Sequence, residues 1–285
     1  MNAVPWHFTL GNFKCIAIRD GGHMLSADFL FCNAPQQELA QALQKYGLEA
    51  DQLKSSWTCL LVDTGEKTLL IDTGVGSGIS EGGQLASQLA QAGYPPENID
   101  LVFLTHGHGD HIGGCTDGNG KLAFSHARYL MGKVEYGFWT SEENLSKLDE
   151  GMAEFARKNL PAIQERVQLV EGGEEILPGI QVIEAFGHTP GHMSLEIQSQ
   201  GEALLYLADA ALHEIHVEHP DWYAPVDMNP EQMIATRYKL LEQAASSRAK
   251  VLVFHFDFPS IGYVLRDGDT WRWRSIRAAN TSTGV

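Results

Sequence analysis

Three histidines and one aspartate fall within six residues in the segment Thr105-His106-Gly107-His108-Gly109-Asp110-His111. Imidazole nitrogens and carboxylates are ligands that zinc and its neighbours prefer. His106 and His108 are two residues apart in an extended stretch, so both side chains point the same way. Asp110 and His111 follow where the chain turns toward a helix, and they can face a second position. Without an ion, such a cluster would leave buried polar groups unpaired, at roughly a few kcal/mol each. The segment therefore predicts a metal site.

Further metal-binding side chains come directly after predicted buried strands, as the first segment does. They are His188 and His192 in one glycine-bounded loop, Asp209, and His255. Residues at strand ends are held rigidly, yet they project into loops that a ligand can approach. The recurrence indicates that all of these groups share one rim with the first segment.

The elements that must position these groups are short strands alternating with helices. Strand-like runs are rich in branched and aromatic residues and are bounded by Gly, Asp or Asn: Lys14–Arg19, Trp57–Val62, Thr68–Ile71, Leu101–Leu104, Gln181–Ala185, Ser194–Ile197, Ala203–Leu207 and Val251–Phe254. Helical patterns fit the following ranges: Gln37–Tyr46, Gln84–Ala92, Met131–Phe138, Leu148–Lys158 and Pro230–Ala245. This mixture predicts an α/β sandwich with helices on the outside.

The stretch Arg19–Pro35 is Gly-rich and carries apolar residues without a clean period. It is predicted to be a long irregular loop. Two interpretations stay open: a lid over a substrate, or a loop folded onto the core.

Size and charge narrow the class of protein. The chain has 285 residues, 44% of them hydrophobic and 20% charged, which is ordinary for a globular protein. The net charge of −16 argues against a nucleic-acid partner. The first residues lack a signal-peptide pattern, and apolar runs are too short to span a bilayer, so we expect a cytoplasmic protein without a membrane partner.

The four cysteines show no C-x-x-C pair and are expected to be reduced core thiols; Cys115 lies close enough to His111 to approach the metals.

In its motifs the sequence resembles the metallo-β-lactamase superfamily. Residues 105–111 fit the H-x-H-x-D-H signature, and Gly187-His-Thr-Pro-Gly-His192, Leu207-Ala-Asp209 and His255 fit the later motifs in order. The resemblance spans roughly residues 10–265. It implies a single domain over residues 1–285 with the four-layer αβ/βα sandwich fold and the site at one edge, between two sheets.

The resemblance also implies two divalent metal ions, with zinc expected and manganese, iron or cobalt as alternatives. The implied ligands are His106, His108 and His192 for one metal, Asp110, His111 and His255 for the other, and Asp209 as a bridge between them. His188 and Asp72 are expected to orient ligands from behind.

Two metals about 3.5–4 Å apart can activate a shared water, so no serine or cysteine nucleophile is required. Asp110 either orients that water and passes on its proton, or only coordinates metal. The segment Asp209–Trp222 is similar to methyl-parathion-hydrolase-like enzymes, which implies a catalytic His213 beside the metals. Well-known lactonases place a tyrosine three residues after the bridging aspartate, where this chain has Leu212.

We therefore expect a hydrolase acting on a small carboxylic ester or lactone, with a phosphotriester as the alternative substrate. Two interpretations from other classes are a mononuclear iron redox enzyme, resembling sulfur dioxygenases, and a non-catalytic metal-binding scaffold. A homodimer fits the resemblance. His216 and His219 are expected to be packing residues, whereas Phe138, Trp139 and Trp222 either line a pocket or belong to the core.

Overall fold

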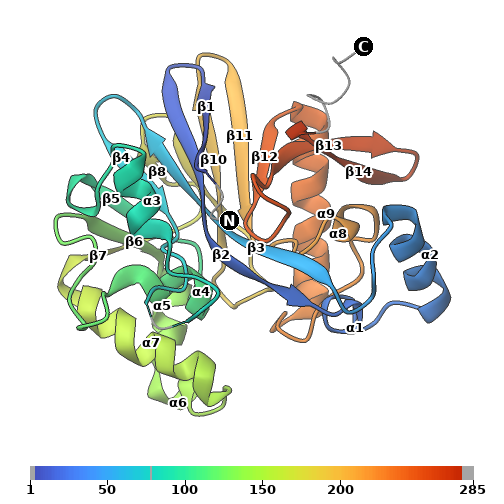
Figure 1. The fold of residues 1–285 in the computed structure, drawn as a ribbon, viewed down its shortest axis with the longest axis horizontal. Coiled ribbons are helices and arrows are strands. Elements are labelled where there is room, and N and C mark those ends of the chain that lie inside the picture. Colours follow the sequence, from blue (N-terminus) through green and yellow to red (C-terminus); the bar gives the residue numbers. More distant parts are fainter. Residues whose placement is uncertain (1–3, 78, 278–285) are drawn as a thin grey trace.

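The computed structural model describes residues 4–77 and 79–277, which form two seven-stranded sheets packed against each other (Figure 1). The first sheet has its strands in chain order: β1 (Trp6–Leu10), β2 (Phe13–Leu25), β3 (Leu53–Asp63), β4 (Thr68–Ile71), β5 (Leu101–Leu104), β6 (Arg128–Gly132) and β7 (Val167–Val170). The second sheet runs from β14 to β8 in reverse chain order: β14 (Thr270–Ser275), β13 (Ile261–Asp267), β12 (Lys250–Val253), β11 (Glu202–Ala208), β10 (Met193–Ser199), β9 (Ile180–Glu184) and β8 (Glu175–Leu177).

The helices lie on the outer faces of the two sheets (Figure 1). Those on the side of the first sheet are α3 (Leu85–Gln91), α4 (Gly109–Ile112), α5 (Lys133–Trp139), α6 (Glu142–Leu145) and α7 (Glu150–Ile163). Those on the side of the second sheet are α1 (Ala27–Leu30), α2 (Gln36–Tyr46), α8 (Ile215–Glu218) and α9 (Pro230–Ser247). Within the described ranges, no helix is both long and apolar enough to cross a bilayer.

The second sheet is buried on both faces, and strand β11 shows how. Leu204 and Tyr206 point into the core between the two sheets, whereas Leu205 and Leu207 pack toward α9. Successive strand residues face opposite ways, so a strand covered on both faces is apolar throughout. α9 begins as its sequence predicts, with Asn229 accepting the amide of Gln232 and Pro230 in the first turn. The predicted fold class, an αβ/βα sandwich, is confirmed.

Two local predictions need correction. The helix expected from Met131 begins at Lys133, because the residues before it form strand β6. The predicted irregular loop Arg19–Pro35 is largely regular: β2 continues to Leu25, and α1 follows.

The reason for the second error is a bulge in β2. Arg19 pairs with Thr58 and Gly21 with Trp57, so that Asp20 is an extra residue without a partner. A bulge shifts the alternation of side chains by one, which hides the period of two from a sequence pattern. The proposed movement of this segment as a lid stays a prediction.

Candidate metal centre

Four side chains each bring one donor atom within 4.8 Å of the others: His106, His108, His188 and Asp209. Nδ1 of His108 lies 3.0 Å from Nε2 of His106 and 3.0 Å from Nε2 of His188. Nε2 of His188 lies 3.3 Å from Oδ2 of Asp209. All four residues are buried. They come from the loops after β5, β9 and β11, so both sheets supply donors to this first group.

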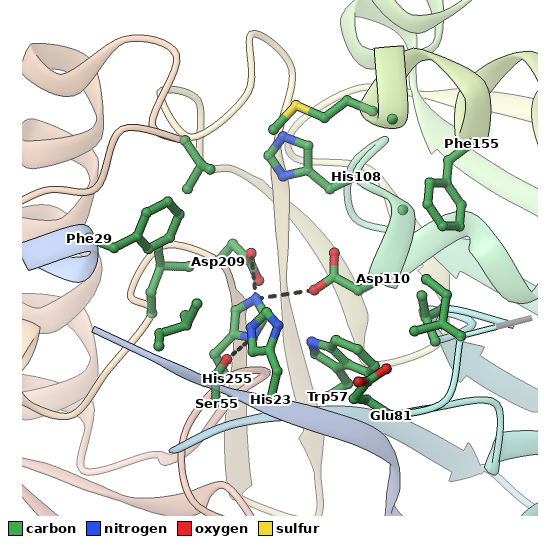
Figure 2. Close-up of a pocket in the computed structure, with 18 of the residues that line it drawn as sticks. His23, Phe29, Ser55, Trp57, Glu81, His108, Asp110, Phe155, Asp209 and His255 are labelled. Atoms are coloured by element: carbon green, nitrogen blue, oxygen red, sulfur yellow. Dashed lines mark hydrogen bonds and ion pairs between the residues drawn. The ribbon is translucent and has the colours of Figure 1, made fainter. Parts of the chain in front are cut away.

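A second group consists of Asp110, His111 and His255. Asp110 and His111 lie in α4 after β5, and His255 follows β12. Asp209 lies between the groups, with Oδ1 3.2 Å from Nε2 of His111 and Oδ2 2.9 Å from Nε2 of His255. Figure 2 shows dashed lines from one ring nitrogen of His255 to the carboxylates of Asp110 and Asp209. Asp209 therefore lies between the two donor groups, and its role as a bridging ligand stays a prediction.

The donor atoms of the two groups are better placed to bind divalent cations than to bind one another. Burial, followed by the neighbouring imidazoles, holds the pKa values of His106 and His108 well below the ordinary range, so both rings are neutral. Neutral rings that meet at 3.0 Å present lone pairs to a common point. Nε2 of His111 and Oδ1 of Asp209 are buried and lie 3.2 Å apart, but within the described chain neither atom makes a hydrogen bond of acceptable geometry. Converging nitrogen and oxygen donors of this kind are the ligands of zinc and similar metals.

In three of the donor histidines, the ring nitrogen Nδ1, which does not face the donor group, has a hydrogen-bond partner of its own that orients the ring. Nδ1 of His111 lies 2.9 Å from Oδ2 of Asp72, as the sequence led us to expect for that aspartate. Nδ1 of His188 lies 2.8 Å from Oδ1 of Asp227. Such partners fix the tautomer and the ring orientation of a metal ligand.

The third pair joins Nδ1 of His255 and Oγ of Ser55 at 2.9 Å. Sequence reasoning missed Ser55 and Asp227, because neither belongs to a motif and each lies far along the chain from the histidine that it contacts.

His192, the predicted ligand, has a different place, which corrects the assignment between the two loop histidines. Its Nδ1 lies 2.9 Å from the carbonyl oxygen of Ala185, and its Nε2 accepts the amide of Asp209 at 3.2 Å. Both nitrogens are therefore used, and His188 takes the position in the donor group. His192 holds the backbone of Asp209 in place, which is an orienting role.

The predicted catalytic residue His213 also needs correction. Among the described residues, it belongs neither to the two donor groups nor to the cavity lining given below. Its Nδ1 accepts the amide of Ile215 at 3.2 Å, its ring packs edge-on against Phe31, and burial lowers its pKa to about 4. Its neighbour Leu212 lines the cavity instead.

The other aromatic and sulfur candidates are packing residues. His216 is fully buried, and His219 stacks on Trp222 with ring centroids 3.9 Å apart. Trp139 and Cys115 belong to the main core. None of these five side chains lines the cavity at the donor groups, as far as the described residues show.

Glu135 ties the two ligand loops together. Its carboxylate accepts the amide of Gly107 at 2.9 Å and the amide of Gly191 at 2.8 Å, and it also accepts the indole N–H of Trp139 at 2.6 Å. The side chain is fully buried, and burial raises its pKa despite these donors. It therefore fixes the distance between the segment of His108 and the loop of His188.

We expect Glu135→Gln to lower the free energy of unfolding by about 3 kcal/mol, because an amide nitrogen must then face a buried N–H donor. Urea unfolding of the metal-free protein measures this. Glu143→Gln is the matched control, since Glu143 forms only an exposed ion pair with Lys147 and should change stability by less than about 1 kcal/mol. Equal effects of the two substitutions would contradict the role given to Glu135.

Metal uptake is expected to release a proton from His188. Burial opposes protonation of this ring, but the carboxylates of Asp209 and Asp227 outweigh it and raise its pKa to about 9. At pH 7 the metal-free ring is therefore charged, and a cation must displace its proton. Affinity should rise with pH to at least about 9, because the pKa of the donor His111 is also well above its ordinary value: burial opposes protonation of that ring, but the carboxylates of Asp209, Asp72 and Asp110 outweigh it. Calorimetric titration in buffers of different ionisation enthalpy measures the release, which Asp227→Asn should reduce. Heats that do not depend on the buffer would contradict this expectation.

A cavity of about 550 Å³ opens onto the donor groups (Figure 2). His108, Asp110, Asp209 and His255 reach it from the donor groups, with His188 beside them. Its apolar wall comes from several elements and consists of Leu25, Phe29, Trp57, Val75, Ile79, Met152, Phe155, Leu212 and Val226. The remaining lining residues include His23, Ser55, Glu81 and Asp149. A concave, mostly apolar space with a few convergent polar groups suits a small organic substrate.

Comparison with known proteins agrees with this geometry. The profile of the Metallo-beta-lactamase superfamily matches residues 57–275. An N-acyl homoserine lactonase of Bacillus cereus is 26% identical over 220 residues, which are 70% of this chain and 80% of that protein.

Two solved structures superpose over nearly the whole chain. AidC, a dizinc quorum-quenching lactonase in complex with a product, has a TM-score of 0.87 at 27% identity and covers 95% of this chain and 97% of its own. The hydrolase AbOPH has a TM-score of 0.90 at 28% identity, with 97% and 98% covered. Fold, donor groups and sequence profile lead to one conclusion: the chain belongs to the metallo-β-lactamase superfamily, among metal-dependent hydrolases.

Proposed function

We propose that the protein hydrolyses a small carboxylic ester or lactone with two divalent metal ions, zinc being the first candidate. The observation that carries the proposal is the apolar cavity that opens directly onto both donor groups. The ligands would be His106, His108, His188 and Asp209 for one ion and Asp110, His111, His255 and Asp209 for the other.

The two apolar sides of the cavity favour a substrate with an acyl chain. Leu25 and Phe29 lie on one side, and Met152 and Phe155 belong to α7 and line another part of the cavity. Figure 2 shows Phe29 and Phe155 at opposite sides of the carboxylates. Burying apolar area contributes about 25 cal/mol per Å², so a hydrocarbon chain would add affinity there.

Metal ions at such a site lower the pKa of a bound water and polarise an ester carbonyl. Asp110 is the residue placed to move the proton, because it lines the cavity and its side chain is 21% exposed. Its Oδ2 lies 3.5 Å from Nε2 of His255, beside the donor groups. It would accept a proton from the attacking water and transfer it to the leaving alcohol. Asp209, by contrast, is buried and held on both sides, which suits a fixed ligand.

The comparisons support the substrate class and the metal. The related Bacillus proteins are N-acyl homoserine lactonases, and one similar structure is a dizinc lactonase. Leu212 occupies the cavity wall where the well-known lactonases are expected to carry a tyrosine, so the contacts to the substrate differ in this chain.

The test is a hydrolysis panel of N-acyl lactones, alkyl lactones, aryl esters and phosphotriesters, with metal content measured on the same sample. We expect the highest kcat/KM for lactones, a rise with acyl chain length, and two zinc equivalents per chain. Higher activity on phosphotriesters than on every ester and lactone would replace the proposed substrate class. One iron per chain with oxygen consumption would overturn hydrolysis altogether.

A further inference from the structure

Helix α9 buries one charged side chain among apolar ones. Its buried face consists of Met233, Arg237, Leu240, Leu241 and Ala244, and Arg237 is only 1% exposed. Among the residues that the structure describes, no other arginine or lysine is buried. Taking a cation out of water is unfavourable, and replacing a buried ion pair with apolar residues of similar size is often neutral for stability or better. The packing of α9 alone therefore does not explain an arginine at this position.

The guanidinium group of Arg237 holds the segment 210–226, which contains α8. Its Nε donates to the carbonyl oxygen of Ala210 at 2.6 Å. Its Nη1 donates to the carbonyl oxygen of Pro220 at 3.0 Å and to that of Trp222. The planar fork of an arginine can bond to several acceptors at once, which the single ammonium group of a lysine cannot do in the same geometry. The segment is therefore fixed at its first residue, directly after a metal-centre aspartate, and at two later points.

The same guanidinium group faces the carboxylate that orients His188. Nη2 of Arg237 lies 3.8 Å from Oδ2 of Asp227, and Oδ1 of Asp227 lies 2.8 Å from Nδ1 of His188. Oδ2 also accepts the amide of Ala224 at 3.1 Å. Asp227 is 4% exposed, and a buried carboxylate is stable only when it is paired and hydrogen-bonded. Arg237 supplies a positive charge that is always present, because a guanidinium group stays protonated in proteins.

The beginning of α9 holds the backbone around His188 as well. The amide of Met228, just before the helix, donates to the carbonyl oxygen of His188 at 3.0 Å. The hydroxyl of Thr236, one residue before the arginine, donates to the carbonyl oxygen of Phe186 at 2.7 Å. This part of the chain therefore holds the histidine by its backbone and by its ring.

We infer that Arg237 is a positioning residue for the first donor group, because it holds Asp227 against His188 and fixes the chain that follows Asp209. The inference rests on the metal binding in the proposed function and does not depend on the substrate. In the described part of the chain, Arg237 neither lines the cavity nor belongs to a donor group. It acts only through the residues that it holds.

The second donor group has supports of its own. Asp72 lies behind His111, and Ser55 lies behind His255. Within residues 4–77 and 79–277, neither support is hydrogen-bonded to Arg237. Loss of the guanidinium group should therefore weaken binding of the ion in the first group and leave the ion in the second group nearly unaffected.

The test measures zinc affinity in two backgrounds that each keep one complete set of histidines. His255→Ala keeps the first group, and His188→Ala keeps the second. Arg237→Met, which retains a long side chain without the charge, is added to each. Competition with a chromophoric chelator under native conditions should show an affinity loss of roughly tenfold in the first background and less than about threefold in the second. Lys239→Met is the matched control, because Lys239 is an exposed residue of α9 and loses the same charge.

A purely structural role of Arg237 predicts a different result. Urea unfolding of the metal-free protein would then change, but the two zinc affinities would stay the same or fall together. Equal losses in both backgrounds, or no loss in the first, would overturn the inference. If Arg237→Met does not fold, Arg237→Lys decides: its ammonium group cannot reach the loop carbonyls and Asp227 together, so we expect a several-fold loss in the first background only. An unchanged zinc affinity of Arg237→Lys in that background counts against the inference.

The wild-type protein separates this inference from the proposed function. Wild-type protein that binds no zinc would overturn the proposed metal centre and the inference with it. Wild-type protein that binds two zinc ions but hydrolyses no member of the panel would overturn the proposed hydrolysis alone, and the affinities of the Arg237 variants would still decide the inference.

Discussion

Replacing Asp209 with asparagine should lower kcat/KM by on the order of 10³-fold or more and reduce the metal content below two ions per chain. Asp209 contacts donors of both groups, His188 in one and His111 and His255 in the other. An amide presents one oxygen and one N–H₂, so it cannot offer an oxygen to both sides. The loss should therefore affect both ions, whereas a substitution within one group affects mainly one. Hydrolysis rates and elemental analysis on the same preparation measure this.

Asp269→Asn serves as the control for Asp209→Asn, since it makes the same change at an exposed turn between β13 and β14. It should retain wild-type metal content and activity. An Asp209→Asn protein that still holds two ions with undiminished affinity would show that the carboxylate does not bridge.

Substitution of the two loop histidines should have opposite signatures. His188→Ala should lose one ion per chain and lower kcat/KM by about 10²-fold or more, because a donor of the first group is missing. His192→Leu should still bind two ions in excess metal. Its free energy of unfolding should fall by about 2 kcal/mol, because the carbonyl of Ala185 and the amide of Asp209 lose their partners.

Metal titration and urea unfolding of both variants decide between the two assignments. If His192→Leu loses an ion while His188→Ala keeps both, the ligand is His192, as the sequence pattern alone suggested.

The sequence pattern identifies most of the donor residues. It does not distinguish His188 from His192, and the reason is physical. His106, His108, Asp110 and His111 could be assigned because they are close in sequence and follow one strand. His188 and His192 belong to a single tight loop, and only the direction of each ring separates the member of the donor group from the residue that supports it. The spacing of residues along the chain does not determine the direction of each ring. The hydrogen bond between His188 and Asp227 determines it for His188.

The residues that hydrogen-bond to the donor histidines and to their loops could not be predicted from the sequence, for a related reason. Ser55 contacts a histidine 200 residues away, and Glu135 contacts loops 28 and 56 residues away. Each is one polar residue among many, without a motif. Asp72 was the exception, because the resemblance to the family implied an orienting role for it.

The fold was predictable where strands were short and apolar, as at β4 and β5, whose bounds match the expected ranges. It was not predictable at β2, where one extra residue at Asp20 changes which side chains face inward. His213 shows the same limit, since its neighbour Leu212 takes the place at the cavity.

Each donor group draws from both sheets, so a bound ion joins segments that are distant along the chain. His106 and His188 are joined in one group, and His111 and His255 in the other. A link of this kind restricts the unfolded chain much as a disulfide does, and more so for long loops. The ions would then act as reversible cross-links between the two halves of the sandwich. A chelator would therefore abolish catalysis and destabilise the fold at the same time. The resistance of the protein to heat and to proteases would depend on the concentration of available metal.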